Sequence, residues 1–333
     1  MPTWSELLPL IFMAVMGLSL LAYVILDGYD LGVGLLLPLG DDAQKDTMIS
    51  SIGPFWDANE TWLVLGVGVL LVAFPKAHGL VLQALYLPVA VMLIGLILRG
   101  VAFDFRVKAP LAYKPFWNGA FFAGSLVATM AQGWMLGSYI TGFERSALGW
   151  AFSLGIALTL PAAYMLLGAG WLIMKTEGEL QQRAVFWARR ALWPMAVALV
   201  GISAATPLVN EAVVAKWFGV PQIFALLPVP LMCAAAFVAV RWVVTRPAVV
   251  AAGYGWLVFV NTVLIFVLAF FGLAYSIFPD IVIGQLTVWE AAAATGSLTV
   301  IFIGTAITLP VIVAYTIFMY RVFWGKARAL TYS

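Results

Sequence analysis

The sequence places carboxylates inside or at the ends of long apolar runs, where they are costly unless they are paired or hydrated. Asp27 and Asp30 fall in LDGYDLGVG, Asp57 and Glu60 in GPFWDANETW, and Asp104 in RGVAFDFR. Carboxylates three residues apart share one face of a helix. Such acids, with tyrosine and water between them, can relay protons or bind a cation.

A structural role is the main alternative for the same residues, and the two roles can hold together. Arg99 and Arg106 flank Asp104, so the acids could pair with these two arginines and hold three helices together. A third interpretation is that the acidic side chains only reach toward water at a membrane surface. The residues alone leave these alternatives open.

The chain that must position these groups is a membrane protein by composition. Of its 333 residues, 64% are hydrophobic and 10% are charged, which is outside the range of soluble domains. We expect an all-α membrane protein with a single integral membrane domain over residues 1–333, because the apolar runs are continuous and lack β alternation. The N-terminus has no basic region or small-residue cleavage site, so we expect a retained first span. About nine stretches are long enough to cross a bilayer: 7–37, 53–73, 80–103, 117–140, 148–174, 191–209, 221–243, 253–276 and 295–320.

The distribution of lysine and arginine predicts the orientation. Of the 17 Lys and Arg residues, only Lys76, Arg145 and Lys216 fall in loops after even-numbered spans. All others lie after odd-numbered spans or in the C-terminal tail. The positive-inside rule therefore predicts a periplasmic N-terminus and a cytoplasmic C-terminus.

This orientation places the acids in one layer. Asp27 lies about 30 Å along the helix from Leu7, roughly one hydrocarbon thickness. Asp57 is expected about one turn into the second span, and the third span returns to the same surface at Arg99. The layer is therefore expected near the cytoplasmic surface. Tyr23 precedes Asp27 by one turn, and the spacing of Gly28 and Gly32 predicts close approach of another helix.

Residues that could hold a redox centre are scarce. His78 is the single histidine and Cys233 the single cysteine, and no haem-attachment motif occurs. The scattered basic residues do not indicate a nucleic-acid partner. The chain itself is therefore expected to bind no metal, to have no catalytic residue of its own, and to serve a partner that holds the cofactors.

Several motifs resemble subunit II of the cytochrome bd-type quinol oxidases. They are LDGYDLGVG, IGPFWDANETWLV, LRGVAFDFR, AQGWMLG, LLGAGWLIMKTEGELQ and YRVFWGKA, in the expected order along the whole chain. The stretch YSIFPDIVIGQLTVWEAA resembles the branch called cyanide-insensitive oxidase.

The resemblance implies an architecture and a partner. Nine spans would form two four-helix bundles plus one peripheral helix in a bacterial inner membrane. Subunit I would carry the haems (two b-type and one d-type, or b in its place) and the quinol site, and the complex would reduce dioxygen to water. A small single-span accessory subunit and a bound quinone or lipid are also compatible with the family.

The resemblance also implies roles for particular residues. Acids matching Asp30, Asp57 and Asp104 are implicated in proton supply, and a tryptophan matching Trp62 marks the mouth of an oxygen channel. Glu60 departs from the pattern, because other members can have Gln there. Two other functions compete with this interpretation: a proton-coupled secondary transporter and a purely structural assembly subunit. Transporter sites favour the midplane and paired repeats, whereas these acids gather at one surface and no repeat is visible.

Overall fold

The computed structural model describes residues 3–209 and 211–327, which form two compact units. The first unit comprises Met1–Asp27, Pro54–Ala84 and Ile277–Gly325, and the second comprises Gly28–Gly53, Leu85–Ser276 and Lys326–Ser333. Arg328, which contributed to the predicted basic C-terminal tail, lies outside the described residues.

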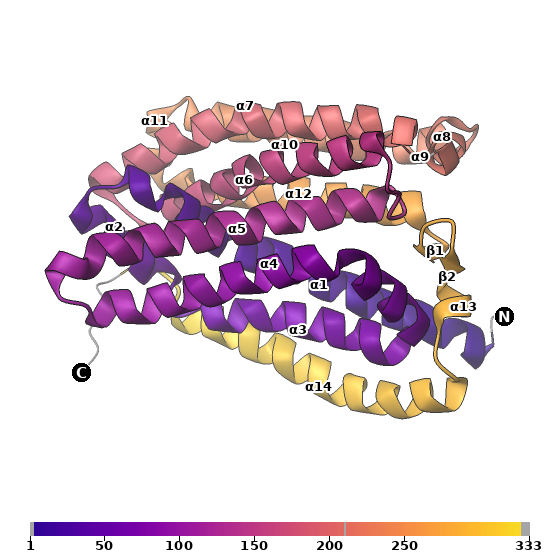
Figure 1. Cartoon of the computed structure of the whole chain (residues 1–333). Helices are drawn as coiled ribbons and strands as arrows, with labels where there is room; N and C mark the ends of the chain where they lie inside the picture. The colour runs from indigo at the N-terminus through magenta and orange to yellow at the C-terminus, as the bar shows by residue number, and fades with distance from the viewer. Residues whose placement is uncertain (1–2, 210, 328–333) are drawn as a thin grey trace. The chain divides into compact units, whose positions relative to one another are not determined.

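The described chain is dominated by long helices (Figure 1). Eight segments are long and apolar enough to cross a membrane: Trp4–Leu39, Trp56–Ala73, Pro75–Lys108, Ala147–Lys175, Gly178–Val209, Gln222–Val244, Trp256–Ile277 and Thr295–Val322. They contain α1 (Trp4–Leu36), α3 (Trp56–Ala73), α4 (Pro75–Lys108), α6 (Ala147–Lys175), α7 (Gly178–Val209), α10 (Pro228–Val244), α12 (Trp256–Ile277) and α14 (Thr295–Val322). The expected all-α membrane fold is confirmed. The stretch expected at 117–140 is also helical, as α5 (Lys114–Ile140), but it is not among these eight.

In the first unit α3 runs antiparallel to α1. The Asn59 side chain donates a hydrogen bond to the backbone oxygen of Leu26 at 3.3 Å. Two turns further along α3, a Cβ on Gly66 would lie 2.9 Å from Leu20. The contacts move backward along α1 as they move forward along α3, as expected for two successive spans.

Helix α14 runs parallel to α1 in the same unit. Near the start of both helices, the Trp4 indole donates to the Thr299 hydroxyl at 3.3 Å. At the other end of α14, Tyr320 stacks on Phe55, which precedes α3, with ring centroids 4.6 Å apart. Leu26 of α1, the start of α3 and the end of α14 therefore lie at one level within this unit.

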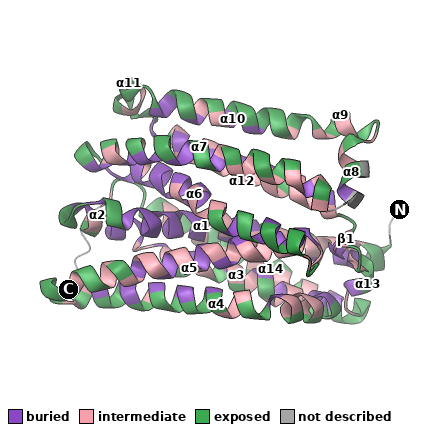
Figure 2. Ribbon diagram, turned by 45° about the horizontal axis from the view of Figure 1, so that its top comes forward, coloured by how far each residue is buried: buried purple, intermediate pink, exposed green. Residues whose placement is uncertain are grey.

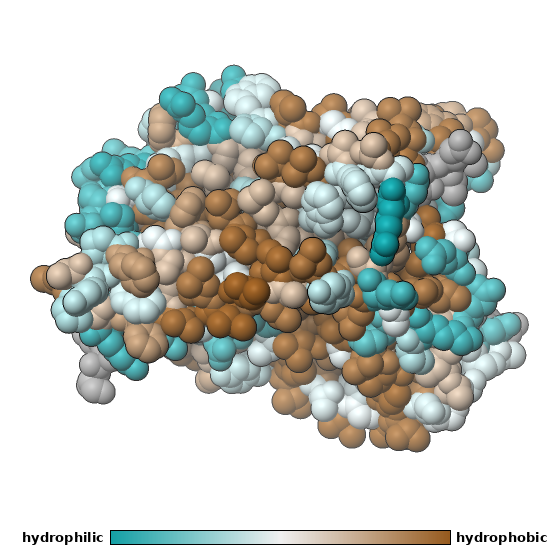
Figure 3. Space-filling model, viewed as in Figure 1, coloured by the Kyte–Doolittle hydropathy of each residue, from teal (hydrophilic) through white to brown (hydrophobic). Residues whose placement is uncertain are grey.

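The second unit is organised around α6. This helix packs against both α5 and α7 and is buried along much of its length, whereas α10 is largely exposed (Figure 2). Glycines permit the close contact with α5, since a Cβ on Gly133 would lie 2.6 Å from the Cα atom of Ala157. On the face seen in Figure 3, hydrophobic residues cover the middle of α4 and α5, whereas hydrophilic residues gather around α2.

Several connections are structured, which the sequence did not indicate. The larger ones are α2 (Asp42–Ile52), α8 (Glu211–Phe218), α9 (Gln222–Leu226) and the antiparallel pair of β1 (Asp280–Val282) and β2 (Leu286–Thr287) followed by α13 (Val288–Ala291). The shorter ones are η1 (Leu37–Leu39), η2 (Leu111–Tyr113), α11 (Pro247–Val249) and η3 (Val250–Tyr254).

One boundary was clearly misplaced. The span expected at 191–209 belongs to α7, which begins at Gly178. Hydropathy located only the apolar part of the helix. Its first turns carry polar residues that bond to α2 and not to lipid, including Arg183, which donates to the Gln44 side chain at 2.9 Å.

Candidate functional site

The last turns of α1 carry two buried carboxylates. Asp27 and Asp30 each expose 0% of their surface, and Tyr23 one turn earlier is also buried. The long apolar stretch of α1 precedes these acids, so they lie near the C-terminal end of the helix. Their burial means that these carboxylates are shielded from lipid by protein.

Helix α6 makes part of that shield. A Cβ on Gly32 would lie 1.9 Å from the backbone oxygen of Tyr164 and 2.9 Å from the backbone nitrogen of Gly168. A Cβ on Gly28 would lie 2.9 Å from the Tyr164 ring. The close approach predicted from the Gly28–Gly32 spacing is therefore confirmed, with α6 as the partner helix.

Aromatic stacking fixes the same contact. Tyr29 stacks on Trp171 of α6 with ring centroids 4.1 Å apart, and both rings are buried. The Trp171 indole also donates to the backbone oxygen of Ser51 at the end of α2. The acid-bearing end of α1 is thus held against α6 on both sides of Asp30.

Arg99 lies in the same layer as Asp30. The arginine is 1% exposed, and a Cβ on Gly124 of α5 would lie 2.7 Å from its backbone nitrogen. The next residue of α5, Ser125, meets α1 at Gly34, where a Cβ would lie 2.2 Å from the serine hydroxyl. Gly34 is one turn beyond Asp30, so α5 brings the buried arginine and the end of α1 to one level.

In the first unit, helix α3 carries its two acids close to the point where it contacts Leu26 of α1. The helix begins at Trp56, so Asp57 occupies the first turn and not the second, and its side chain is exposed. Glu60 is half-buried, and Trp62 is buried at 8% exposure. Asp57 is therefore the accessible member of the pair on α3.

Asn59, between those two acids, was missed in the sequence. Its side chain is 1% exposed, donates to the backbone oxygen of Leu26 and accepts a hydrogen bond from the Tyr320 hydroxyl at 3.1 Å. One amide thus joins α1, α3 and α14 directly beside Asp27. An amide between two acids at the start of a span was the available signal. Tyr320 gave none, because it lies about 260 residues away in sequence.

Asp104 and Arg106 occupy opposite faces of α4. Asp104 is exposed and Arg106 is buried. Arg106 donates to the side chains of Asp46, at 2.7 Å, and of Asn118. Among the described residues Arg106 makes its ion pair with Asp46. The sequence had suggested the acids of the apolar runs as its partners and did not indicate Asp46. The reason is that α4 continues two turns beyond Arg99, to the level of α2.

Asp46 anchors α2 to α4 and α5. Lys114 also lies within 3.2 Å of its carboxylate, whose side chain is 52% exposed. Partial burial raises the pKa of Asp46, but the hydrogen bonds and charges of Arg106 and Lys114 outweigh it and leave the pKa below its usual value. The carboxylate therefore stays ionised at neutral pH.

The chemistry available in each unit follows from the contrast in burial. In the second unit the buried carboxylate of Asp30 is enclosed by α6 and Asp104 of α4 is exposed, and in the first unit Asp27 is buried and Asp57 of α3 is exposed. An exposed acid can exchange protons with water, and a buried one can hold or pass a proton away from water. The arrangement suits proton transfer, and the buried Arg99 also suits ionic locking.

The chain is similar to known proteins along most of its length. The sequence family described as "Cytochrome bd terminal oxidase subunit II" matches residues 8–323. The chain is 27% identical to "Cytochrome bd ubiquinol oxidase subunit 2" of Bacillus subtilis (strain 168) over 327 residues, covering 90% of this chain and 91% of that protein. It is 26% identical to "Cytochrome bd-I ubiquinol oxidase subunit 2" of Escherichia coli (strain K12) over 374 residues, covering 96% and 95%. Its fold is similar to a chain of "The structure of bd oxidase from Geobacillus thermodenitrificans", with a TM-score of 0.78, 16% identity and coverage of 95% and 98%.

Proposed function

Because the chain belongs to the cytochrome bd terminal oxidase subunit II family, we propose that it is the subunit without haem in a quinol oxidase that reduces dioxygen to water. It is a multi-pass bacterial membrane protein and a subunit of an oxidoreductase of electron transport. In the proposal, subunit I carries haems b and d, or b only, and the quinol site. This chain stabilises subunit I, supplies protons and aids oxygen access. Family membership favours this function over a secondary transporter.

We propose that protons enter from the cytoplasm through the acids of α1, α3 and α4. The observation that carries this proposal is the complete burial of Asp27 and Asp30 at the end of a span. Exposed Asp57 and Asp104 would collect protons, half-buried Glu60 would assist, and the buried pair would pass them inward. Taking protons from one side stores energy, since one charge crossing the membrane is worth about 2.3 kcal/mol per 100 mV.

The proposed orientation is a periplasmic N-terminus and a cytoplasmic C-terminus. The parallel direction of α1 and α14 supports placing the two termini on opposite sides of the membrane. Two parallel spans require that the number of crossings, counted from α1 to α14 inclusive, is odd. Eight crossings cannot satisfy this, whereas α5, at 27 residues or about 40 Å, would be the ninth. The count of nine also agrees with the positive-inside distribution.

Three finer roles complete the proposal. Trp62 is buried on α3, in keeping with a place beside an internal oxygen path. Arg99 is the proposed charge partner of the α1 acids, because it is buried at their level. A small accessory subunit and a bound quinone or lipid are compatible with the family.

The decisive experiment replaces Asp30 by Asn in the assembled complex. Asn keeps the shape and the hydrogen-bonding capacity but does not titrate. A positioned proton donor typically contributes about 10²–10⁴ in rate, so we expect oxygen consumption to fall at least about tenfold while quinol still reduces the haems. Asp280→Asn, in β1 and outside the spans, is the control and should keep full turnover.

Two results would count against the proton role. Wild-type turnover and proton uptake in assembled Asp30→Asn would exclude it. Loss of haem from Asp30→Asn but not from Asp30→Glu would show that the negative charge holds the complex together, and would favour the structural role.

A further inference from the structure

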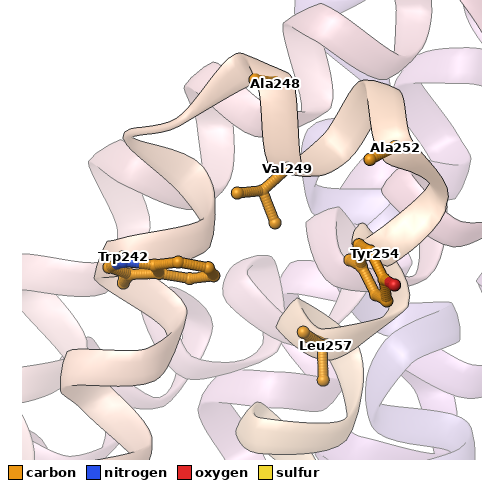
Figure 4. A pocket seen from close by; sticks show the side chains of 6 residues that line it. All are labelled: Trp242, Ala248, Val249, Ala252, Tyr254 and Leu257. Carbon is orange, nitrogen blue, oxygen red and sulfur yellow. The ribbon is translucent and has the colours of Figure 1, made fainter.

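A cavity at the end of α10 lies outside the acidic layer and is not used by the proposed function. It has a volume of about 450 Å³ and is lined by Trp242, Ala248, Val249, Ala252, Tyr254 and Leu257 (Figure 4). This size lies within the range of small-ligand pockets, about 300–1,000 Å³. The lining side chains are apolar or aromatic.

The local backbone shapes this cavity. After α10 the chain forms the short α11 and then η3, where Gly253 adopts a φ of 88° before α12 begins. This left-handed residue turns the chain back, so that Trp242 before the turn and Leu257 after it face the same space, as Figure 4 shows. The wall is a loop between two spans and not the side of a helix bundle.

The cavity lies at the end of a candidate membrane span, Gln222–Val244. It follows directly on the apolar run of α10, and Trp242 and Tyr254 at its mouth are 43% and 55% exposed. Trp and Tyr concentrate at the boundary between hydrocarbon and headgroups. An acyl chain could therefore reach the cavity from the hydrocarbon side.

Two arginines lie near this cavity without lining it: Arg241 precedes Trp242 in α10, and Arg246 stacks on the Trp242 ring. The guanidinium of Arg246 lies 4.9 Å from the Trp242 ring centroid, and that of Arg241 lies 5.4 Å from the ring of Trp193 on α7. Among the described residues neither arginine makes an ion pair, and residues 212–279 contain no Asp or Glu. The acid of the adjacent α7, Glu179, is bound by Arg183 at 3.3 Å.

We propose that this cavity binds an anionic phospholipid, with an acyl chain against Trp242 and Leu257 and the phosphate at Arg246. Guanidinium groups bind phosphate oxygens through their planar fork of donors. Basic pockets at the ends of spans are a recurrent form of anionic-lipid recognition. A neutral quinone would use the apolar wall but not the arginines, so the charge favours the lipid.

The test uses the intact oxidase complex in nanodiscs containing a photoactivatable phosphatidylglycerol. After illumination, mass spectrometry measures labelling of the peptide that spans residues 242–257. We expect labelling that unlabelled phosphatidylglycerol suppresses and phosphatidylcholine does not. Arg246→Gln should lower it about fivefold. Ala252→Trp, which fills the cavity while keeping both arginines, should abolish it.

Arg190→Gln is the matched control, because Arg190 stacks on Phe186 of α7, whereas Arg246 stacks on Trp242, which lines the cavity. It should label like the wild type. Equal suppression by phosphatidylcholine, or unchanged labelling of Arg246→Gln, would overturn the proposal. Suppression by a short-chain quinone but not by phosphatidylglycerol would assign the cavity to quinone and also overturn it. None of these measurements depends on turnover, so they are independent of the proton proposal.

Discussion

Replacing Gly168 by Ala should destabilise the complex through the contact between α6 and α1. The added Cβ would lie 2.5 Å from two backbone atoms, the carbonyl carbon of Gly32 and the nitrogen of Val33. Ordinary contacts begin near 3.4 Å, so the helices must separate by about 0.9 Å. Overpacking of this kind typically costs about 1–3 kcal/mol. Because both opposing atoms are backbone, no side chain can rotate away, and we expect the upper part of that range.

The same helix supplies the control. A Cβ on Gly155 would meet no neighbouring atom within 4 Å, so Gly155→Ala should be neutral or gain about 0.5–1 kcal/mol from higher helix propensity. Loss of haem absorbance on heating the solubilised complex measures the difference. About 2–4 °C per kcal/mol is typical of domains of 150–250 residues, so Gly168→Ala should lose haem several degrees below Gly155→Ala.

The displacement should also affect turnover. Asp30 lies half a turn before Gly32, so a shift of this contact moves the carboxylate by a comparable distance. A misplacement of about 1 Å can cost 10²-fold in rate. Complexes of Gly168→Ala that do assemble should therefore consume oxygen more slowly. Suppose that Gly168→Ala has the same melting temperature as Gly155→Ala and consumes oxygen at the wild-type rate. Then α1 and α6 are not in the close contact described, and α6 does not enclose the acids.

Four other outcomes are expected. Asp46→Asn should lower the free energy of unfolding at neutral pH by about 1 kcal/mol or less, read as a lower melting temperature, because the pair is half exposed. Since the folded pKa of Asp46 is lowered, the difference from wild type should be full above the unfolded pKa of about 3.9 and vanish as pH falls through the folded pKa. Arg99→Ala should lower the stability of the assembled complex by about 3–5 kcal/mol, and Arg99→Lys should restore part of it. Arg189→Ala, at an exposed position, should leave the stability unchanged. Equal melting temperatures of Arg99→Ala and Arg189→Ala would contradict a buried pair at Arg99. Tyr320→Phe removes the hydroxyl bonded to Asn59 and should cost about 0.5–1.5 kcal/mol in a thermal melt, and an unchanged melt would show that this bond contributes nothing to stability. A reporter active only in the cytoplasm should work when fused to the C-terminus, and activity of a periplasmic reporter there would reverse the orientation.

The sequence predicted features that depend on local periodicity and depth. The apolar runs located the long helices, and the Gly28–Gly32 spacing predicted a close helix contact because a missing Cβ is visible in sequence. It did not predict that α7 begins at Gly178, since a helix that leaves the membrane loses its apolar signal. It also could not predict the Arg106–Asp46 pair, because the position of α2 depends on tertiary contacts far apart in sequence.

The exposure of Asp104 has a physical explanation within the second unit. Arg99 and Arg106 are seven residues apart and both buried, so they share the inner face of α4, while Asp104 points away from them. An ionised carboxylate facing hydrocarbon would be costly. Asp104 avoids this cost because it lies only about 3 Å along the helix axis from Arg106. Arg106 is tied to Asp46, whose side chain is half exposed to solvent. In the proposed orientation Asp104 would therefore lie nearer the headgroups than Arg99, by about 7.5 Å along the helix axis. A proton taken up at Asp104 would then have to travel inward to reach the level of Asp30, so the depth order along α4, and not the sequence order of the acids, would set the direction of the proposed path.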